Sequence, residues 1–180
     1  MKIIAITTPK VTSDDLPIIR GLIGKGIDVI HLRKPDSCID ECRDLLLRLT
    51  DKERGRIVIH DYPELYDEFK LLGIHINKNV TSFPSGYSGL RTRSCHSFEE
   101  VMMYKEDYDY LFLSPIFNSI SKQGYLSGFT HDELVRASEE GIIDRKVVAL
   151  GGVTFDKIEY LKGLGFGGAA MIGALYNTSN

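Results

Sequence analysis

The chain has 180 residues, of which 43% are hydrophobic, and a formal net charge of −3. This length and apolar content suit one folded domain with a buried core, which we predict to span residues 1–180. The charge balance and the absence of a Lys/Arg run argue against a basic surface for nucleic acid or anionic lipid. No apolar run approaches the ~18 residues of a membrane span.

The cysteines predict a chain of reduced thiols. The chain has three cysteines, an odd number, at Cys38, Cys42 and Cys95. The first two lie four residues apart, so the sequence has no C-x-x-C pattern for zinc or redox chemistry. The first residues turn polar too early for a signal peptide. We therefore expect a cytoplasmic protein.

Strands and helices alternate along the first half of the chain. Short apolar runs predict four strands, at residues 2–7, 28–32, 57–60 and 73–76. Apolar residues at helical spacing predict three helices between them, at residues 14–23, 39–49 and 63–72. The Gly-, Ser- and Pro-rich segment 81–89 leaves little room for a helix after the fourth strand.

The second half repeats this alternation. Four further strands are predicted at residues 90–96, 110–114, 146–150 and 168–172. Helices are expected after the first three, starting near Ser97, Thr130 and Thr154. Ser97 with Glu100 and Thr130 with Glu133 each predict a capping box. The chain ends soon after the last strand, so we expect the last helix to be short or missing.

Eight strand–helix units predict an α/β fold, a compact (β/α)8 TIM barrel. The strands read as continuous apolar runs, which is typical of parallel sheets covered on both faces. A barrel of about 250 residues is usual, so this one is small. An open Rossmann-type sheet is the alternative, but the first turn lacks the G-x-G-x-x-G pattern.

In a barrel, the carboxyl ends of the strands meet at one mouth, where ligands bind. The residues expected there are His31, Arg33, His60, Asp61, Asn77, Ser94, His96, Ser114, Gly151, Gly152 and Gly173.

Imidazole is the natural proton carrier near neutral pH, so the histidines are the first catalytic candidates. We favour His96, because the Ser94 hydroxyl shares its strand face two residues away. For His31 and His60, a functional and a structural role stay equally open. We expect a structural role for His75, in the middle of a strand, and a surface position for His131.

Cationic residues indicate where an anion binds. Arg33 and Lys34 follow the second strand, and two cations at a strand end suit a phosphate or diphosphate, although a solvated loop is a serious alternative for Lys34. Lys122, in the long loop after residue 114, could close over an anion or lie exposed. His31, His60 and Asp61 could form a metal site, but no ligand spacing is diagnostic and we assign no metal.

Two glycine turns predict a phosphate site. Gly151 and Gly152 end the seventh strand, while Ile172 and Gly173 end the eighth. Barrels often hold a phosphate in their last two loops, on bare backbone N–H groups and a helix start. Glycine allows the backbone to approach an anion closely.

In their order, these motifs resemble the thiamin phosphate synthase superfamily, which includes the thiamin phosphate synthases and the TenI-type thiazole tautomerases. The resemblance rests on segments 30–34, 58–61, 73–76, 94–100, 107–110, 114–117, 148–153 and 170–174, and on Lys122. It implies a TIM barrel, a role in thiamin biosynthesis and a small phosphorylated thiazole as ligand. A homo-oligomer is possible, but the sequence does not fix the oligomeric state.

The two branches of this superfamily do different chemistry. A synthase joins a pyrimidine diphosphate to a thiazole phosphate with Mg²⁺ on the diphosphate, whereas a tautomerase aromatises a thiazole carboxylate phosphate by proton transfer without metal. The resemblance implies Gln in a synthase at the position of His31 and Asn at that of His60. It implies Lys at the position of Pro35 and a second metal aspartate at that of Val80.

These departures lead us to expect a TenI-like tautomerase without cofactor. The resemblance then implies that His96 is the acid/base, that Arg33 meets the carboxylate and that the two glycine turns hold the phosphate. Lys34, His60, Asp61, Ser94 and Lys122 are expected to contact substrate, as is His31. The alternatives are an Mg²⁺-dependent synthase and a barrel that binds a thiamin precursor without turnover.

Overall fold

A computed structural model describes residues 1–117 and 128–172 of the chain. Its eight strands form a closed parallel barrel in chain order, β1 to β8, which confirms the predicted (β/α)8 fold. The residues group into two compact units, residues 4–91 and residues 1–3 with 92–180. The single domain over 1–180 stays a prediction, and the predicted loss of the last helix falls on residues 173–180, outside the described residues.

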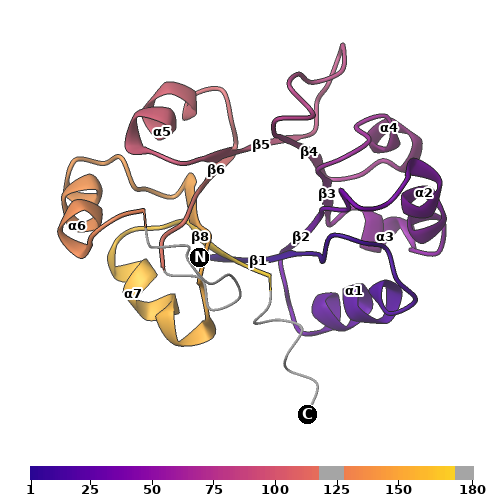
Figure 1. The fold of residues 1–180 in the computed structure, drawn as a ribbon, viewed down its shortest axis with the longest axis horizontal. Helices are drawn as coiled ribbons and strands as arrows, with labels where there is room; N and C mark the ends of the chain where they lie inside the picture. The colour runs from indigo at the N-terminus through magenta and orange to yellow at the C-terminus, as the bar shows by residue number, and fades with distance from the viewer. Residues whose placement is uncertain (118–127, 173–180) are drawn as a thin grey trace. The chain divides into compact units, whose positions relative to one another are not determined.

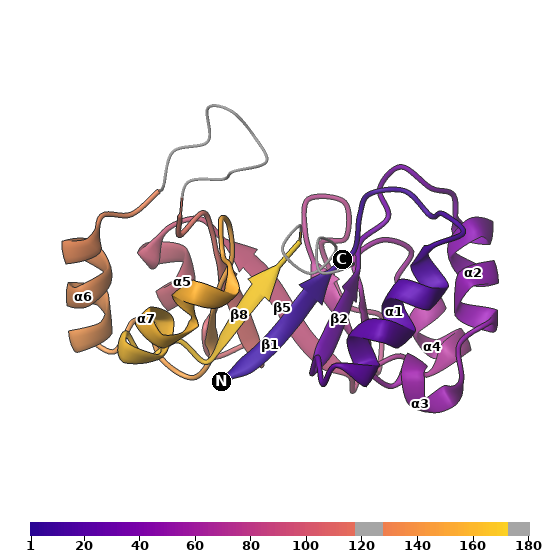
Figure 2. The same cartoon turned by 90° about the horizontal axis from the view of Figure 1, so that it is seen from below.

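The first unit carries the first four strands with their helices. The strands are β1 (Lys2–Ile6), β2 (Val29–Leu32), β3 (Ile57–Ile59) and β4 (Gly73–Ile76). The helices are α1 (Asp15–Gly24), α2 (Ile39–Leu47), α3 (Asp51–Arg54) and α4 (Leu65–Phe69), and they cover one side of these strands (Figure 1). Ile6 pairs with His31, and His31 with Val58. The arrowheads of β1 and β2 point the same way in Figure 2, as parallel pairing requires.

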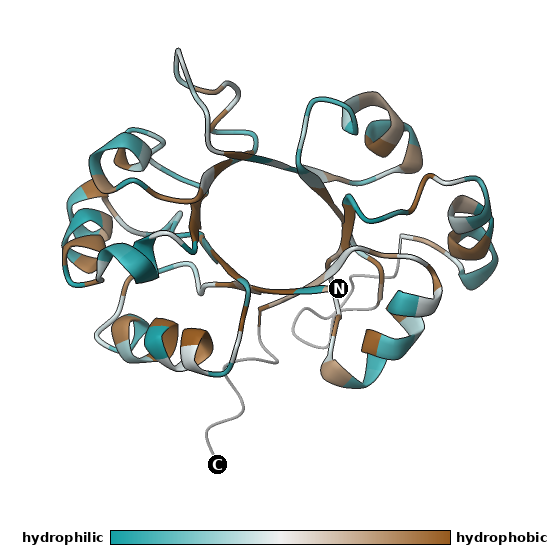
Figure 3. Ribbon diagram, turned by 180° about the vertical axis from the view of Figure 1, so that it is seen from behind, coloured by the Kyte–Doolittle hydropathy of each residue, from teal (hydrophilic) through white to brown (hydrophobic). Residues whose placement is uncertain are grey.

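The helices of this unit follow their apolar spacing. Leu16, Ile19 and Leu22 are the buried apolar residues of α1, and they recur every three residues on the face toward the sheet. Figure 3 shows the strands mostly in brown, whereas the helices carry brown and teal residues in alternation. The helix predicted over 63–72 is shorter than expected, because Lys70 takes a left-handed conformation with φ 51° that ends α4.

The segment after β4 has no helix among residues 77–89, as predicted. The Tyr87 hydroxyl joins the two strands that flank this segment, because it accepts from the Ile74 N–H at 2.7 Å and donates to the Leu90 carbonyl at 2.5 Å. Gly73 allows this close pairing, since a Cβ there would lie 2.3 Å from the Leu90 carbonyl oxygen.

The second unit carries the other strands, of which β5 begins two residues before it. The strands are β5 (Leu90–Cys95), β6 (Tyr110–Leu113), β7 (Val147–Ala149) and β8 (Gly168–Met171). The helices are α5 (Phe98–Tyr104), α6 (His131–Glu139) and α7 (Ile158–Gly163), with a short 3₁₀ turn, η1 (Phe155–Lys157), before α7. Leu111 of β6 pairs with Val147 of β7, and Val148 with Gly168 of β8.

One of the two predicted capping boxes forms. Thr130 accepts from the Glu133 N–H, and the Glu133 carboxylate accepts from the Thr130 N–H at 2.7 Å. At α5 only one of the two hydrogen bonds of the predicted box forms. Ser97 accepts from the Glu100 N–H, but the Glu100 carboxylate accepts from the His96 N–H at 2.6 Å. Among the described residues, no helix is long and apolar enough to cross a membrane.

Candidate functional site

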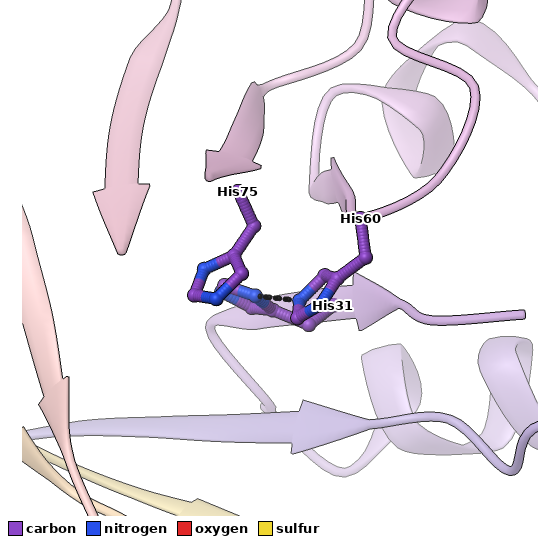
Figure 4. Close-up of side chains that lie close together, drawn as sticks. All are labelled: His31, His60 and His75. Atoms are coloured by element: carbon purple, nitrogen blue, oxygen red, sulfur yellow. Dashed lines mark hydrogen bonds between the residues drawn. The ribbon is translucent and has the colours of Figure 1, made fainter. Parts of the chain in front are cut away.

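Three histidines of the first unit form a buried cluster. His31 lies on β2, His60 directly follows β3 and His75 lies on β4, and their rings point toward one another (Figure 4). Their exposed fractions are 0%, 5% and 1%. Parallel pairing of β2, β3 and β4 places the three residues on neighbouring strands, so their side chains meet although up to 44 positions separate them in sequence.

The rings of this histidine cluster contact one another directly. His31 Nδ1 lies 2.7 Å from His60 Nε2, so one nitrogen donates a proton and the other accepts it. The rings of His60 and His75 stack with centroids 4.0 Å apart. Burial, followed by the charge of His75, lowers the pKa of both His31 and His60 well below its usual value. His31 and His60 are therefore neutral near pH 7.

The side chains that meet in the structure differ from the set that the sequence suggested for a metal site. His75 joins His31 and His60, in place of Asp61. The Asp61 carboxylate accepts instead from the Lys34 N–H at 3.0 Å. The structural role expected for His75 stays untested. The sequence does place His75 on the strand that follows His60. A strand pattern does not give the register between two strands, however, so it could not predict that the two rings meet.

Arg33 and Lys34 lie side by side in sequence but in opposite environments. The Arg33 backbone is held on both sides by Thr7, whose Oγ1 accepts from the Arg33 N–H at 2.9 Å and donates to its carbonyl at 3.1 Å. The Arg33 guanidinium is exposed, and it has no hydrogen bond or ion pair to another described residue. It is thus available to an anion.

The Lys34 ammonium is already engaged inside the protein. It donates to Asp15 at 2.5 Å and to the Lys10 carbonyl at 3.0 Å. The side chains of Lys34 and Asp15 are 1% and 2% exposed. The predicted contact between Lys34 and an anion would require this buried pair to open, and it stays a prediction.

A cavity of about 280 Å³ lies where β3 and β4 end in the first unit. It is lined by Pro35, Asp61, Tyr62, Pro63, Glu64, Asn79 and Val80. Two of these residues, Asp61 and Glu64, carry carboxylates, and Asn79 carries an amide. Glu64 was not among the residues expected at the site, because it lies in the first turn of the helix predicted over 63–72, where an acidic residue is ordinary.

His96 is exposed in the second unit, one residue after β5 ends. Its Nδ1 lies 3.0 Å from the Ser114 carbonyl oxygen, which only accepts, so Nδ1 carries the proton. In the neutral ring, Nε2 is therefore the basic nitrogen. Ser94 is half-buried and pairs with Phe112 in the β5–β6 ladder.

The glycine turn after β7 has backbone N–H groups on residues that have no side chain of their own. Gly151 and Gly152 both have positive φ, 91° and 62°. Among the described residues, neither N–H donates a hydrogen bond. A Cβ on Gly151 would lie 2.8 Å from Pro115 Cα, so the turn requires glycine. Ile172 is the last described residue and is exposed, whereas Gly173 and Lys122 lie outside the described residues.

The sequence matches the model of one protein family, thiamine monophosphate synthase, over residues 3–175. The chain belongs to this family. The curated thiamine-phosphate synthase of Bacteroides thetaiotaomicron is 26% identical over 164 residues, which cover 83% of this chain and 78% of the relative. The thiamine-phosphate synthase of Phocaeicola vulgatus has the same identity and coverage.

Solved structures agree with this assignment. The crystal structure of thiamine phosphate pyrophosphorylase from Bacteroides thetaiotaomicron has a TM-score of 0.90 and 41% identity, over 100% of this chain and 87% of that one. The thiamine phosphate pyrophosphorylase from Pyrococcus furiosus, with a TM-score of 0.75 and 18% identity over 99% and 88% of the chains, shows the fold alone. The protein is thus a thiamin-biosynthesis enzyme with a TIM barrel. The two curated relatives carry the synthase name, which favours the synthase alternative over the tautomerase we expected.

Proposed function

We propose that the protein is a thiamin phosphate synthase, which joins a pyrimidine diphosphate to a thiazole phosphate and releases diphosphate. The observation that carries this proposal is its likeness, over almost the whole chain, to a structure with the pyrophosphorylase name at 41% identity. The curated relatives with the synthase name support the same reading.

The cavity at the ends of β3 and β4 offers oxygen ligands for the Mg²⁺ that the family implies. Asp61 and Glu64 line it with carboxylates and Asn79 with an amide, the ligand types that Mg²⁺ prefers. Val80 supplies no ligand, so Glu64 is the second carboxylate in this proposal. Bound there, Mg²⁺ would neutralise the diphosphate and ease its departure.

The chain's own groups bind the remaining negative charge. The exposed Arg33 guanidinium is suited to a bidentate contact with diphosphate oxygens, and the Thr7 hydroxyl fixes the backbone that carries it. The N–H groups of Gly151 and Gly152 are suited to the thiazole phosphate, because they are bare and glycine allows close approach.

The test is synthesis of thiamin phosphate by the purified protein from the two substrates, with Mg²⁺ or with EDTA. We expect turnover with Mg²⁺ and none with EDTA. Glu64→Gln should reduce turnover by at least about tenfold and raise the Mg²⁺ requirement, whereas Glu68→Gln, on the exposed face of α4, should leave both unchanged. A folded protein that makes no thiamin phosphate with Mg²⁺ would overturn the proposal.

The tautomerase is a second candidate, favoured by one feature of the same cavity. Val80 places an apolar side chain where the resemblance implies a metal carboxylate. His96, with Nε2 as its basic nitrogen, is suited to move a proton on a thiazole ring without metal. Aromatisation changes the absorbance of the thiazole, so turnover unaffected by EDTA would support this candidate. Substrate binding without either reaction would support the non-catalytic alternative.

A further inference from the structure

We propose that His31, His60 and His75 bind one divalent transition metal ion of the zinc class through their ring nitrogens. This site is distinct from the Asp61–Glu64 cavity, and it does not depend on which reaction the protein catalyses. The proposal rests on how the three strands bring the rings together.

The distances within the histidine cluster fit a site without bound metal. Its three potential ligand nitrogens all lie within 4.8 Å of one another. Histidine binds zinc at about 2.0–2.1 Å, which places neighbouring nitrogens of a tetrahedral ion about 3.4 Å apart. The 2.7 Å contact between His31 and His60 is shorter than this, because the two nitrogens share a proton. Metal binding would require that proton to move to the other nitrogen of its ring. The rings of His60 and His75, which stack at an interplanar angle of 15°, would also have to turn so that their lone pairs meet at one ion.

The chemistry of the cluster selects the ion. Imidazole nitrogen suits zinc, copper, nickel and iron(II), whereas magnesium and calcium require oxygen ligands. The cluster contains no carboxylate among the described residues, so it does not compete for the Mg²⁺ of the cavity. His31 and His60 are neutral near pH 7, which leaves a lone pair on each ring for a metal. The nearby charge of Arg33 opposes a cation, but it is the smallest of the effects acting on His60.

The cluster lies inside the protein. Its three rings are each 5% exposed or less. An ion bound by three imidazoles would engage a nitrogen of each ring at once and leave a fourth position for water or an anion.

The experiment is a titration of metal-free protein with Co²⁺ alone, followed by its displacement with Zn²⁺. We expect one ion per chain, the visible absorption of tetrahedral Co²⁺ and a higher melting temperature with Zn²⁺. His60→Asn and His75→Asn should each weaken Co²⁺ binding at least about tenfold. His131→Asn is the matched control, because His131 is exposed on α6 and should change nothing.

X-ray absorption of the wild-type protein loaded with Zn²⁺ keeps the test decisive if a cluster variant fails to fold. Three imidazole ligands around the ion would support the proposal. It is overturned by binding of less than one ion per chain at saturation, by fewer than three imidazole ligands, or by equal loss of binding in His131→Asn. The cluster would then be a set of neutral histidines stabilised by their mutual contacts.

Discussion

The two units of the chain differ in how they keep the histidines and cations found near strand ends. Residues 4–91 hold a buried histidine cluster and the buried Lys34–Asp15 ion pair, beside the exposed Arg33. The second unit leaves His96 exposed and the Gly151–Gly152 turn bare. The same residue types at strand ends thus acquire different chemistry, because burial decides whether a group serves the protein or is open to a ligand.

The largest effect is expected at the exposed histidine. If the protein turns over the thiazole carboxylate phosphate, His96→Asn should lower kcat by about 10²–10⁴-fold, the usual contribution of a general acid–base group. KM should change much less, since other residues hold the phosphate. The unfolding free energy should stay nearly constant, because the side chain is exposed. Parallel kcat and melting measurements test this, with His131→Asn as control.

A stable His96→Asn variant with normal turnover would remove His96 from the mechanism. A variant that loses stability but keeps its rate per folded molecule would make His96 a structural residue, held by Ser114 and Glu100. Either result would contradict the view that the exposed His96 serves the reaction whereas the buried histidines serve the protein.

The next effect is expected at the buried ion pair. Lys34→Met leaves the Asp15 carboxylate buried without its partner and should cost about 3–5 kcal/mol of unfolding free energy. The double variant Lys34→Met with Asp15→Leu should recover most of this loss, since an apolar pair can replace a buried ion pair. Urea unfolding measures both.

The exposed pair Lys162–Glu159 provides the control for this measurement. Lys162→Met should change the unfolding free energy by about 0.5 kcal/mol or less, because exposed pairs contribute little. Similar losses at Lys34 and Lys162 would contradict the conclusion that the Lys34 charge is committed to the interior.

A third effect is expected in the pH dependence of stability. His31 and His60 have a lower pKa in the folded protein than the ~6.5 of an unfolded chain, so the unfolded state binds more protons below that pH. Stability should therefore fall as pH drops below ~6.5, by up to about 1.4 kcal/mol per pH unit for each of the two histidines. These two residues should contribute no slope above it.

Unfolding in urea with EDTA at a series of pH values between 5 and 8 checks this expectation. His131→Asn should keep the acid slope, because that residue is exposed, whereas His60→Asn should reduce it. A slope that is unchanged in His60→Asn would show that the cluster is accessible to protons in the folded state.

Local patterns in the sequence were enough to predict the alternation of strands and helices and the positions of the turns. The predicted strand 73–76 matches β4 (Gly73–Ile76), and the Thr130–Glu133 capping box formed as expected. The capping box depends on contacts within three residues, and the strand is marked by a short apolar run, so a local pattern records both. The family followed from the same short motifs taken in order, and the comparisons confirm it.

The contacts between polar groups could not be predicted in this way, because they form between residues far apart in the sequence. The partner of Lys34 is Asp15, 19 positions earlier, and the partners of His75 lie on other strands. Glu64 became a candidate ligand only through the cavity that it shares with Asp61. Strand periodicity gives the face of a side chain but not the register of its neighbours or its depth of burial, and those two quantities set its protonation and its access to a ligand.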